Sequence, residues 1–330
     1  MKYLQKIIVF TLSIILISSM FLIIDKGFAQ NPQTEYQKKK EEYEKEKARV
    51  EAENKEKAAL LEEQKRINAS KKAYNEGTTY LKKGMADEAL KSYDLSIQYD
   101  NNFALAYYGK GVALAKLRRY DDALAAYHKA VTLDPLYADA YLSLAKLYRQ
   151  LDRYDEALTM CLKAIDADTI SGNAKTKDLI SAYYELGYVY NKRKDFQKAA
   201  NAFGEITKLD PNYSKAYNAQ GVALEKADKT DQAIAAYQKA VETDPKYYEA
   251  YGRLASLYNK IGQHDKALDA ALNSLKYKPN YALAAFEAGT AYKNLGQPEN
   301  AIKYFDIAAK DRAWLQSARY EIDMIKRKMK

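Results

Sequence analysis

An alanine recurs along this 330-residue chain at a nearly constant interval. Successive members of the series lie 34, 34, 42, 34, 34 and 34 residues apart: Ala89, Ala123, Ala157, Ala199, Ala233, Ala267 and Ala301. A small residue precedes each alanine by twelve positions, and a side chain that is usually large follows it by four. A fixed period over most of a chain indicates a repeat architecture, in which neighbouring units must stack to bury their apolar faces.

Each 34-residue unit has room for two helices of about 14 residues and their turns. The small residue of the first helix, for example Gly111 or Gly221, and the alanine of the second allow the two backbones to approach closely. Acids such as Asp121 and Asp231 open the second helices, where a negative charge interacts favourably with the helix dipole. Gly (13) and Pro (6) are scarce, which also favours helices. The pattern therefore predicts an all-α fold.

The recurring positions together resemble the sequence pattern of the tetratricopeptide repeat family over residues 70–313. The second unit carries the pattern most completely, in Tyr107, Gly111, Ala123, Tyr127, Ala130 and Pro135. The resemblance implies an α-solenoid of helix pairs wound as a right-handed superhelix. It predicts seven repeats, at residues 70–103, 104–137, 138–171, 180–213, 214–247, 248–281 and 282–315. Eight extra residues, near 172–179, separate the third repeat from the fourth.

The two ends of the chain differ from the repeats. An apolar stripe formed by Trp314, Leu315, Ala318, Ile322 and Ile325 predicts a capping helix in residues 314–330, which end in a basic tail. At the other end, Lys2 and Lys6 precede the apolar residues 7–24, and Gly27-Phe28-Ala29 forms a small-x-small site. Residues 1–29 thus have the pattern of a signal peptide cleaved after Ala29, or of an uncleaved signal anchor. We expect the chain to be exported, periplasmic or extracellular, or anchored in the membrane by residues 7–24.

Residues 30–69 contain ten acids and ten bases and very few apolar side chains. Acids precede bases by four positions, as in Glu53 and Lys57, which stabilises a solvated helix. Tyr36, Tyr43 and Val50 recur every seven residues, which indicates a thin coiled-coil seam. Two interpretations remain: a charged helix that acts as a spacer, which we prefer, and a coiled coil through which residues 30–69 self-associate.

Composition argues against several classes of function. One cysteine, Cys161, and two distant histidines, His128 and His264, argue against a disulfide, a multi-thiolate or histidine-rich metal site and a catalytic triad. No motif for a cofactor or a catalytic nucleophile is present, so we expect neither cofactor nor enzymatic activity. The net charge of +9 is concentrated at the ends, with seven bases against three acids in residues 310–330, which argues against nucleic-acid binding by the repeats.

The family resemblance implies that a partner binds in the concave groove, on first-helix residues not used for packing. By register, the candidates are Tyr108, Lys146, Arg149, Tyr184, Tyr188, Asn191, Asn218, Arg253, Asn259 and Phe286. These side chains offer aromatic anchors and hydrogen-bond donors for a peptide or protein segment. Successive first helices lack the Lys, Asn and Arg set with which chaperone-binding members clamp a C-terminal carboxylate. We therefore expect a non-catalytic interaction scaffold or assembly adaptor; the alternative is a self-assembling structural envelope protein.

Overall fold

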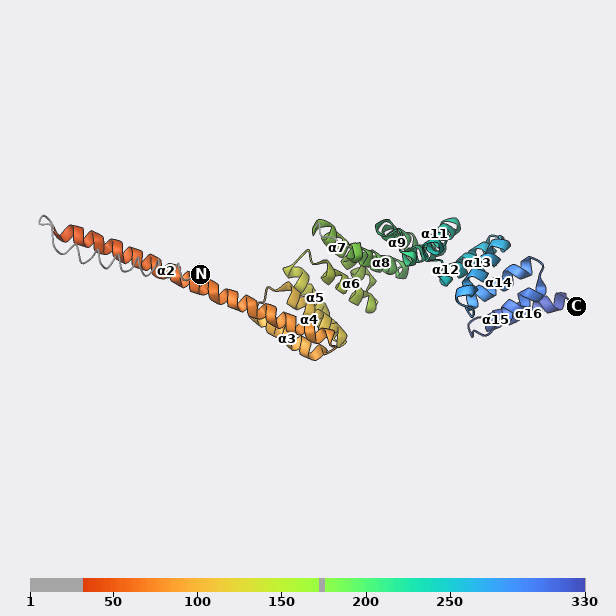
Figure 1. Cartoon of the computed structure of the whole chain (residues 1–330), viewed down its shortest axis with the longest axis horizontal. Helices are drawn as coiled ribbons and strands as arrows, with labels where there is room; N and C mark the ends of the chain where they lie inside the picture. The colour runs from red at the N-terminus through yellow and green to blue at the C-terminus, as the bar shows by residue number, and fades with distance from the viewer. Residues whose placement is uncertain (1–31, 172–175, 330) are drawn as a thin grey trace. The chain divides into compact units, whose positions relative to one another are not determined.

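The computed structural model describes residues 32–171 and 176–329, and the described part is helical without a strand (Figure 1). Two compact units divide the chain, the first up to Asn68 and the second from Ala69 onward. The helices are α2 (Pro32–Lys82), α3 (Ala86–Tyr99), α4 (Ala104–Lys116), α5 (Tyr120–Leu133), α6 (Ala138–Gln150), α7 (Tyr154–Ser171), α8 (Thr176–Lys192), α9 (Phe196–Leu209), α10 (Ser214–Lys226), α11 (Thr230–Thr243), α12 (Tyr248–Lys260), α13 (His264–Tyr277), α14 (Ala282–Asn294), α15 (Pro298–Ala308) and α16 (Leu315–Lys328).

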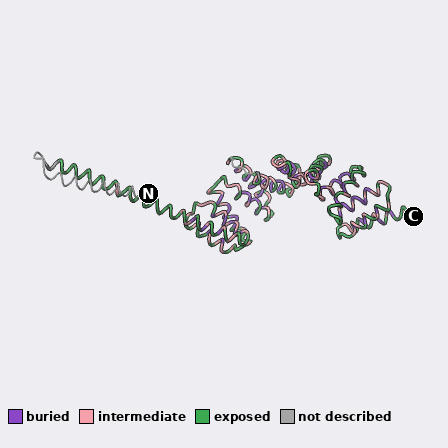
Figure 2. The backbone as a smooth tube through the Cα atoms, in the orientation of Figure 1, coloured by how far each residue is buried: buried purple, intermediate pink, exposed green. Residues whose placement is uncertain are grey.

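The first unit contains most of the long helix α2. Every side chain from residue 35 to residue 66 is exposed except Val50, which is half-buried (Figure 2). Ion pairs within the helix, such as Lys57 with Glu53 at 3.9 Å, link neighbouring turns. Glu, Lys, Ala and Gln have high helix propensity, so this segment forms a helix without an apolar face to bury.

The second unit is an α-solenoid of helix pairs, which confirms the predicted fold class. Helices α4 and α5 pack on each other, as do α6 with α7, α8 with α9, α10 with α11, α12 with α13 and α14 with α15. The seven alanines of the 34-residue series are all fully buried. A methyl group at this position lets the second helix approach the first, and larger side chains surround the contact.

An aromatic ring of the second helix packs directly against the Cα of a glycine in the first helix, in the space that a Cβ would need. A Cβ built on Gly221 would lie 2.6 Å from the ring of Tyr237, and one on Gly187 would lie 2.7 Å from Phe203. Where the first helix has alanine instead, at positions 145 and 255, the second helix has Cys161 and Ala271 in place of the ring. The small side chains at 161 and 271 therefore compensate for the extra methyl group, and the buried volume is conserved.

The turn between the two helices of each pair contains one residue with positive φ. Glycine takes this conformation in three turns, and a non-glycine residue takes it in four: Gly84, Gly262 and Gly296; Arg118, Asp152, Lys194 and Asp228. A left-handed residue ends the first helix and redirects the chain into the second. The four non-glycine residues have φ between 57° and 65°, so a Cβ is strained at each of these turns.

The extra residues between the third and fourth units lengthen the flanking helices. Helix α7 has 18 residues, whereas most of the other second helices have 14, and α8 begins at Thr176, four residues before the expected start of its unit. At the other end of the second unit, Ala318, Ile322 and Ile325 of α16 are buried against Ala301 and Phe305. Helix α16 therefore covers the last helix pair.

The expected signal or anchor segment, residues 1–29, lies outside the described residues. Among the helices of the described part, none combines the length and the apolar character needed to cross a bilayer. Export and anchoring therefore stay predictions from the sequence.

Candidate functional site

The ten groove candidates lie on the first helix of their pairs, α4 to α14. Lys146, Tyr184 and Tyr188 are exposed, and the other seven are half-buried. Along each first helix, candidates such as Tyr184, Tyr188 and Asn191 lie three or four residues apart, which places them on one face. We call the surface formed by Tyr184, Tyr188, Asn191 and Asn218 the α8–α10 surface.

Two of the candidates mainly serve packing. Tyr108 packs on Tyr127 and Tyr137, with ring centroids 5.7 and 4.9 Å away, and burial raises the pKa of its hydroxyl. Phe286 lies 5.1 Å from Phe305 and 4.8 Å from Trp314. Both rings fill the space between a first helix, its second helix and the start of the next unit, which leaves less of each available to a partner.

Three other candidates form polar links between successive first helices. Arg149 of α6 forms an ion pair with Glu185 of α8, whose side chain is almost completely buried. The guanidinium of Arg253 lies 3.5 Å from the carboxylate of Glu225 on the preceding first helix. Asn259 Nδ2 donates to Glu287 Oε2 at 2.8 Å, and burial raises the pKa of that carboxyl group. The cations expected to contact a ligand are thus largely neutralised within the chain.

The glutamates of these links were missed by the sequence analysis. Their signal is the spacing: Glu225 and Arg253, and Asn259 and Glu287, lie 28 residues apart, which is six less than the repeat. Lys293 and Glu321 form a fourth link at the same spacing, 2.7 Å apart. The offset of six residues joins the end of one first helix to the middle of the next, so no local pattern reveals it.

The series of links is interrupted between α8 and α10. Asn191 stands at the linking position of α8, but the residue 28 positions later is Ala219, which has no polar side chain. The buried Oδ1 atoms of Asn191 and Asn218 have no hydrogen-bond partner in the described part of the chain. A buried acceptor without a partner costs about 1–3 kcal/mol, so these two oxygens require an explanation.

Two exposed tyrosines accompany these amides. Tyr184 packs edge-on against Phe203 with 5.5 Å between centroids and is 38% exposed. Tyr188, also 38% exposed, lies under the guanidinium of Arg149, 4.8 Å from its ring centroid. Burial raises the pKa of Tyr247, whose hydroxyl lies near the Asn218 side chain, to about 12. The α8–α10 surface therefore combines two exposed, fixed aromatic rings with two covered amide oxygens that have no partner in the described chain.

Cys161 and the two histidines each have a structural environment in the described part of the chain. Burial raises the pKa of the Cys161 thiol to about 12, so this cysteine is an inert core residue. His128 Nε2 lies 2.6 Å from the hydroxyl of Tyr148, and Nδ1 of His264 lies 3.0 Å from Asn259 Oδ1. Within the described residues, no group of His, Cys, Asp and Glu is suited to hold a metal ion.

Family models for the tetratricopeptide repeat match residues 104–137, 136–212 and 184–248. A fourth model, described as the TT21 fifth ARM repeats domain, matches residues 221–326. The chain is a tetratricopeptide repeat protein, as the sequence pattern predicted. Membership of this family places it in the class of protein-interaction scaffolds, which are typically non-catalytic.

Several solved structures share this fold, and two of the three named below are described as tetratricopeptide repeat proteins. YrrB, described as a TPR protein with an unusual peptide-binding site, is 25% identical, with a TM-score of 0.50 over 58% of this chain and 95% of its own. PilF of Pseudomonas aeruginosa is 19% identical, with a TM-score of 0.52, 66% of this chain and 96% of its own. A protein from Parabacteroides merdae is 14% identical, with a TM-score of 0.50, 78% of this chain and 99% of its own. None of the curated proteins matches the chain.

Proposed function

We propose that this protein is an interaction scaffold that holds an extended segment of a partner protein on the α8–α10 surface. The observation that carries the proposal is the pair of exposed tyrosines, Tyr184 and Tyr188, beside two amide oxygens, of Asn191 and Asn218, that have no hydrogen-bond partner in the described chain. The chain itself covers both oxygens, so the two amide groups would rotate outward to accept from the backbone N–H groups of an extended segment. Each bond formed would remove the cost of a buried acceptor that lacks a partner.

The exposed tyrosines supply the apolar part of the same interaction. Tyr184 rests on Phe203 and Tyr188 under Arg149, so both rings are held in place before a ligand arrives. Rigid aromatic side chains lose little conformational entropy on binding, which makes them effective anchors. Because Arg149 and Arg253 are already paired with glutamates, we expect backbone contacts rather than a ligand carboxylate to dominate. The peptide-binding site named for YrrB, a protein of the same fold, is consistent with this function.

The test begins with a photo-crosslinking amino acid at position 188 of the full chain in its own cells. A matched control places the same group at Gln232, which is exposed on the second helix α11. The proposal predicts a partner captured from position 188 and absent from position 232. A peptide covering the captured segment should then bind the purified chain, and N-methylation of its contacting amides should weaken binding by about tenfold or more.

Further variants separate the site from general stability. Asn218→Ala and Tyr184→Ala should weaken binding of that peptide, whereas Asn273→Ala, on the exposed side of α13, should not. Binding that survives both N-methylation and the Tyr184→Ala, Asn218→Ala double substitution would show that the α8–α10 surface is not the site.

We also propose that residues 1–29 direct the chain across a membrane, as a cleaved signal or as an anchor. Their positive start, apolar stretch and Gly27-Phe28-Ala29 site support this location. Fractionation of cells and N-terminal sequencing of the mature chain test it. A chain that begins at Gln30 in the exported fraction supports cleavage, a membrane-bound chain with Lys2 intact supports an anchor, and a chain in the cytosol contradicts both.

Self-association through residues 30–69 is a second candidate function. Leu60 and Leu61 are 70% and 54% exposed, and Tyr36 and Tyr43 are also exposed, so helix α2 has apolar groups that a second helix would cover. Light scattering on the full chain and on a chain without residues 30–68 tests this alternative. A multiple of the chain mass that falls to one chain in the shortened protein would favour self-assembly.

A further inference from the structure

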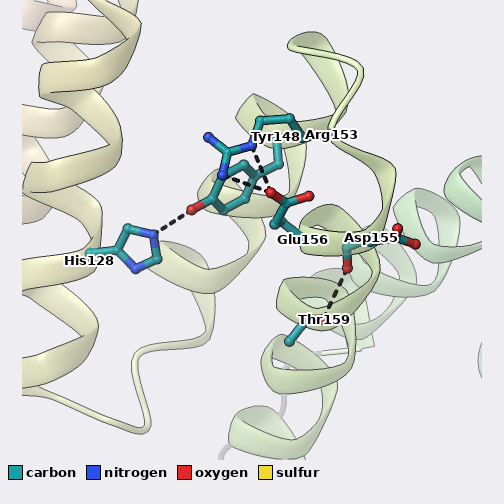
Figure 3. Close-up of polar contacts among 6 residues, drawn as sticks. All are labelled: His128, Tyr148, Arg153, Asp155, Glu156 and Thr159. Carbon is teal, nitrogen blue, oxygen red and sulfur yellow. Dashed lines mark hydrogen bonds and ion pairs between the residues drawn. The ribbon is translucent and has the colours of Figure 1, made fainter.

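In one unit a tyrosine of the first helix reaches across to the preceding second helix (Figure 3), and we call the space that its ring occupies the groove. Tyr148 of α6 extends between α5 and α7, and its hydroxyl lies 2.6 Å from His128 Nε2. The guanidinium of Arg153 lies 4.6 Å from the Tyr148 ring centroid and is held by Glu156 at 2.7 Å. Four groups thus meet around this groove: the phenol of Tyr148, its hydrogen-bond partner His128, the cation Arg153 and the carboxylate of Glu156.

A similar arrangement, without the carboxylate, recurs 110 residues later in the chain, in the third helix pair after the insertion. Tyr258 of α12 accepts a hydrogen bond from Gln238 Nε2 at 2.9 Å, and the ammonium group of Lys266 lies 5.7 Å from its ring centroid. A tyrosine that fills the groove, a polar partner on the preceding second helix and a cation over the ring are therefore a repeated feature of this chain.

One repeat before Tyr148, a leucine replaces the tyrosine, while an acceptor, a cation and a carboxylate stand at the other three positions. Leu114 stands 34 residues before Tyr148, Asp94 before His128, Arg119 before Arg153 and Asp122 before Glu156. Arg119 and Asp122 keep their ion pair, at 2.7 Å. Leucine is too short to reach the preceding second helix, and an open cavity of about 320 Å³ lies at this place, between α3, α4 and α5.

The cavity offers a phenol ring the same kinds of contact as the groove around Tyr148, namely apolar side chains, an acceptor and a cation. Its lining includes the apolar side chains of Leu90, Leu114 and Ala126 and the charged side chains of Asp94 and Arg119. Lys110 Nζ contacts Asp94 Oδ1 at 2.7 Å, which leaves the second carboxylate oxygen as an acceptor. A cavity of about 150 Å³ suffices for benzene, so this one has ample volume for a phenol ring.

We propose that this cavity binds a tyrosine side chain from a segment of a partner protein. The ring would occupy the space that the Tyr148 ring fills one repeat later, its hydroxyl would donate to Asp94, and Arg119 would lie over its face. The carboxylate acceptor favours tyrosine over phenylalanine, and the cation favours an aromatic ring over an aliphatic group. The site is separate from the α8–α10 surface, so it does not depend on the function proposed above.

The test uses 4-methylphenol, which is the tyrosine side chain cut at Cβ, and toluene, its phenylalanine counterpart. Each is titrated into the full chain carrying labelled leucine methyl groups, and binding is followed by NMR. We expect 4-methylphenol to shift the methyl signals of Leu90 and Leu114 saturably and to bind about tenfold or more tightly than toluene. Leu114→Tyr, which fills the groove from within, should abolish binding.

Two further variants ensure that the conclusion does not rest on Leu114→Tyr alone. Asp94→Leu changes an exposed residue and should reduce the affinity for 4-methylphenol to that for toluene. Tyr148→Leu should open a second cavity and add a second binding site, which a folded chain would report as new shifts at Leu124 and Leu144. A tyrosine-bearing peptide should compete with 4-methylphenol in the wild-type chain and have no effect on Leu114→Tyr.

Three outcomes would overturn the proposal. The first is an absence of shifts at Leu90 and Leu114 up to the solubility limit of 4-methylphenol. The second is equal affinity for toluene and 4-methylphenol in the wild-type chain, or binding that persists in a folded Leu114→Tyr chain. The third is a light-scattering mass of two chains that falls to one in Leu114→Tyr, because the occupant would then be a second copy of this chain.

Discussion

Gly221 of α10 lies directly against the ring of Tyr237 of α11, and replacing it with alanine tests how this array is packed. The added Cβ would lie 2.6, 2.8 and 2.9 Å from three ring carbons of Tyr237. Tyr237 is fully buried, and its hydroxyl donates to Glu225 Oε2 at 2.9 Å, so the ring is restrained at both ends. The ring has little room to move away from the new methyl group.

Two opposing effects set the expected change in stability. Overpacking of a core by one methyl group costs about 1–3 kcal/mol, and the restrained ring places this site near the upper end. Alanine in a helix interior is favoured over glycine by about 1 kcal/mol. Gly221→Ala should therefore lower the free energy of unfolding by about 2 kcal/mol.

Urea denaturation followed by circular dichroism and by hydrogen exchange of α10 and α11 measures this change, because a repeat array need not unfold in one step. Gly204→Ala is the matched control: it also lies inside a helix, α9, but its Cβ would meet only the end of the Gln220 side chain, at 3.0 Å. It should raise stability by up to about 1 kcal/mol. If both variants changed stability in the same direction, the close approach of Gly221 to Tyr237 would not limit the packing.

Three other predictions concern the turns, the polar links and pH. Gly262→Ala should lower stability by about 1–2 kcal/mol, because Gly262 has φ of 77°; unchanged urea unfolding would contradict this. Glu185→Ala should cost about 3 kcal/mol in the same assay by leaving Arg149 without its buried partner, and Glu185→Gln should cost less. Burial lowers the pKa of His128, so stability is complete above its unfolded pKa of about 6.5 and falls as the pH drops through that value. Thermal unfolding of His128→Gln should lack this decrease, since glutamine makes the equivalent bond at position 238.

The sequence predicted the family and the all-α solenoid because the fold depends on a local period. Each alanine of the 34-residue series had to pack against its own neighbouring helix, and all seven are buried. The repeat boundaries, the export segment and the binding role of the ten groove residues stay predictions. The sequence also suggested Arg149 and Arg253 as ligand contacts. The 34-residue period did not predict that they pair with Glu185 and Glu225.

The sequence by itself determined which residues recur, and hence that helices pair and stack. Only the tertiary structure decided which recurring side chains remain available. Asn191 keeps an unused oxygen because the next first helix has Ala219, and the groove beside Leu114 stays open because that side chain does not reach the preceding second helix. Both depend on a contact between different repeats. A repeat fixes where a side chain points, but whether a partner meets it depends on a residue about one repeat away.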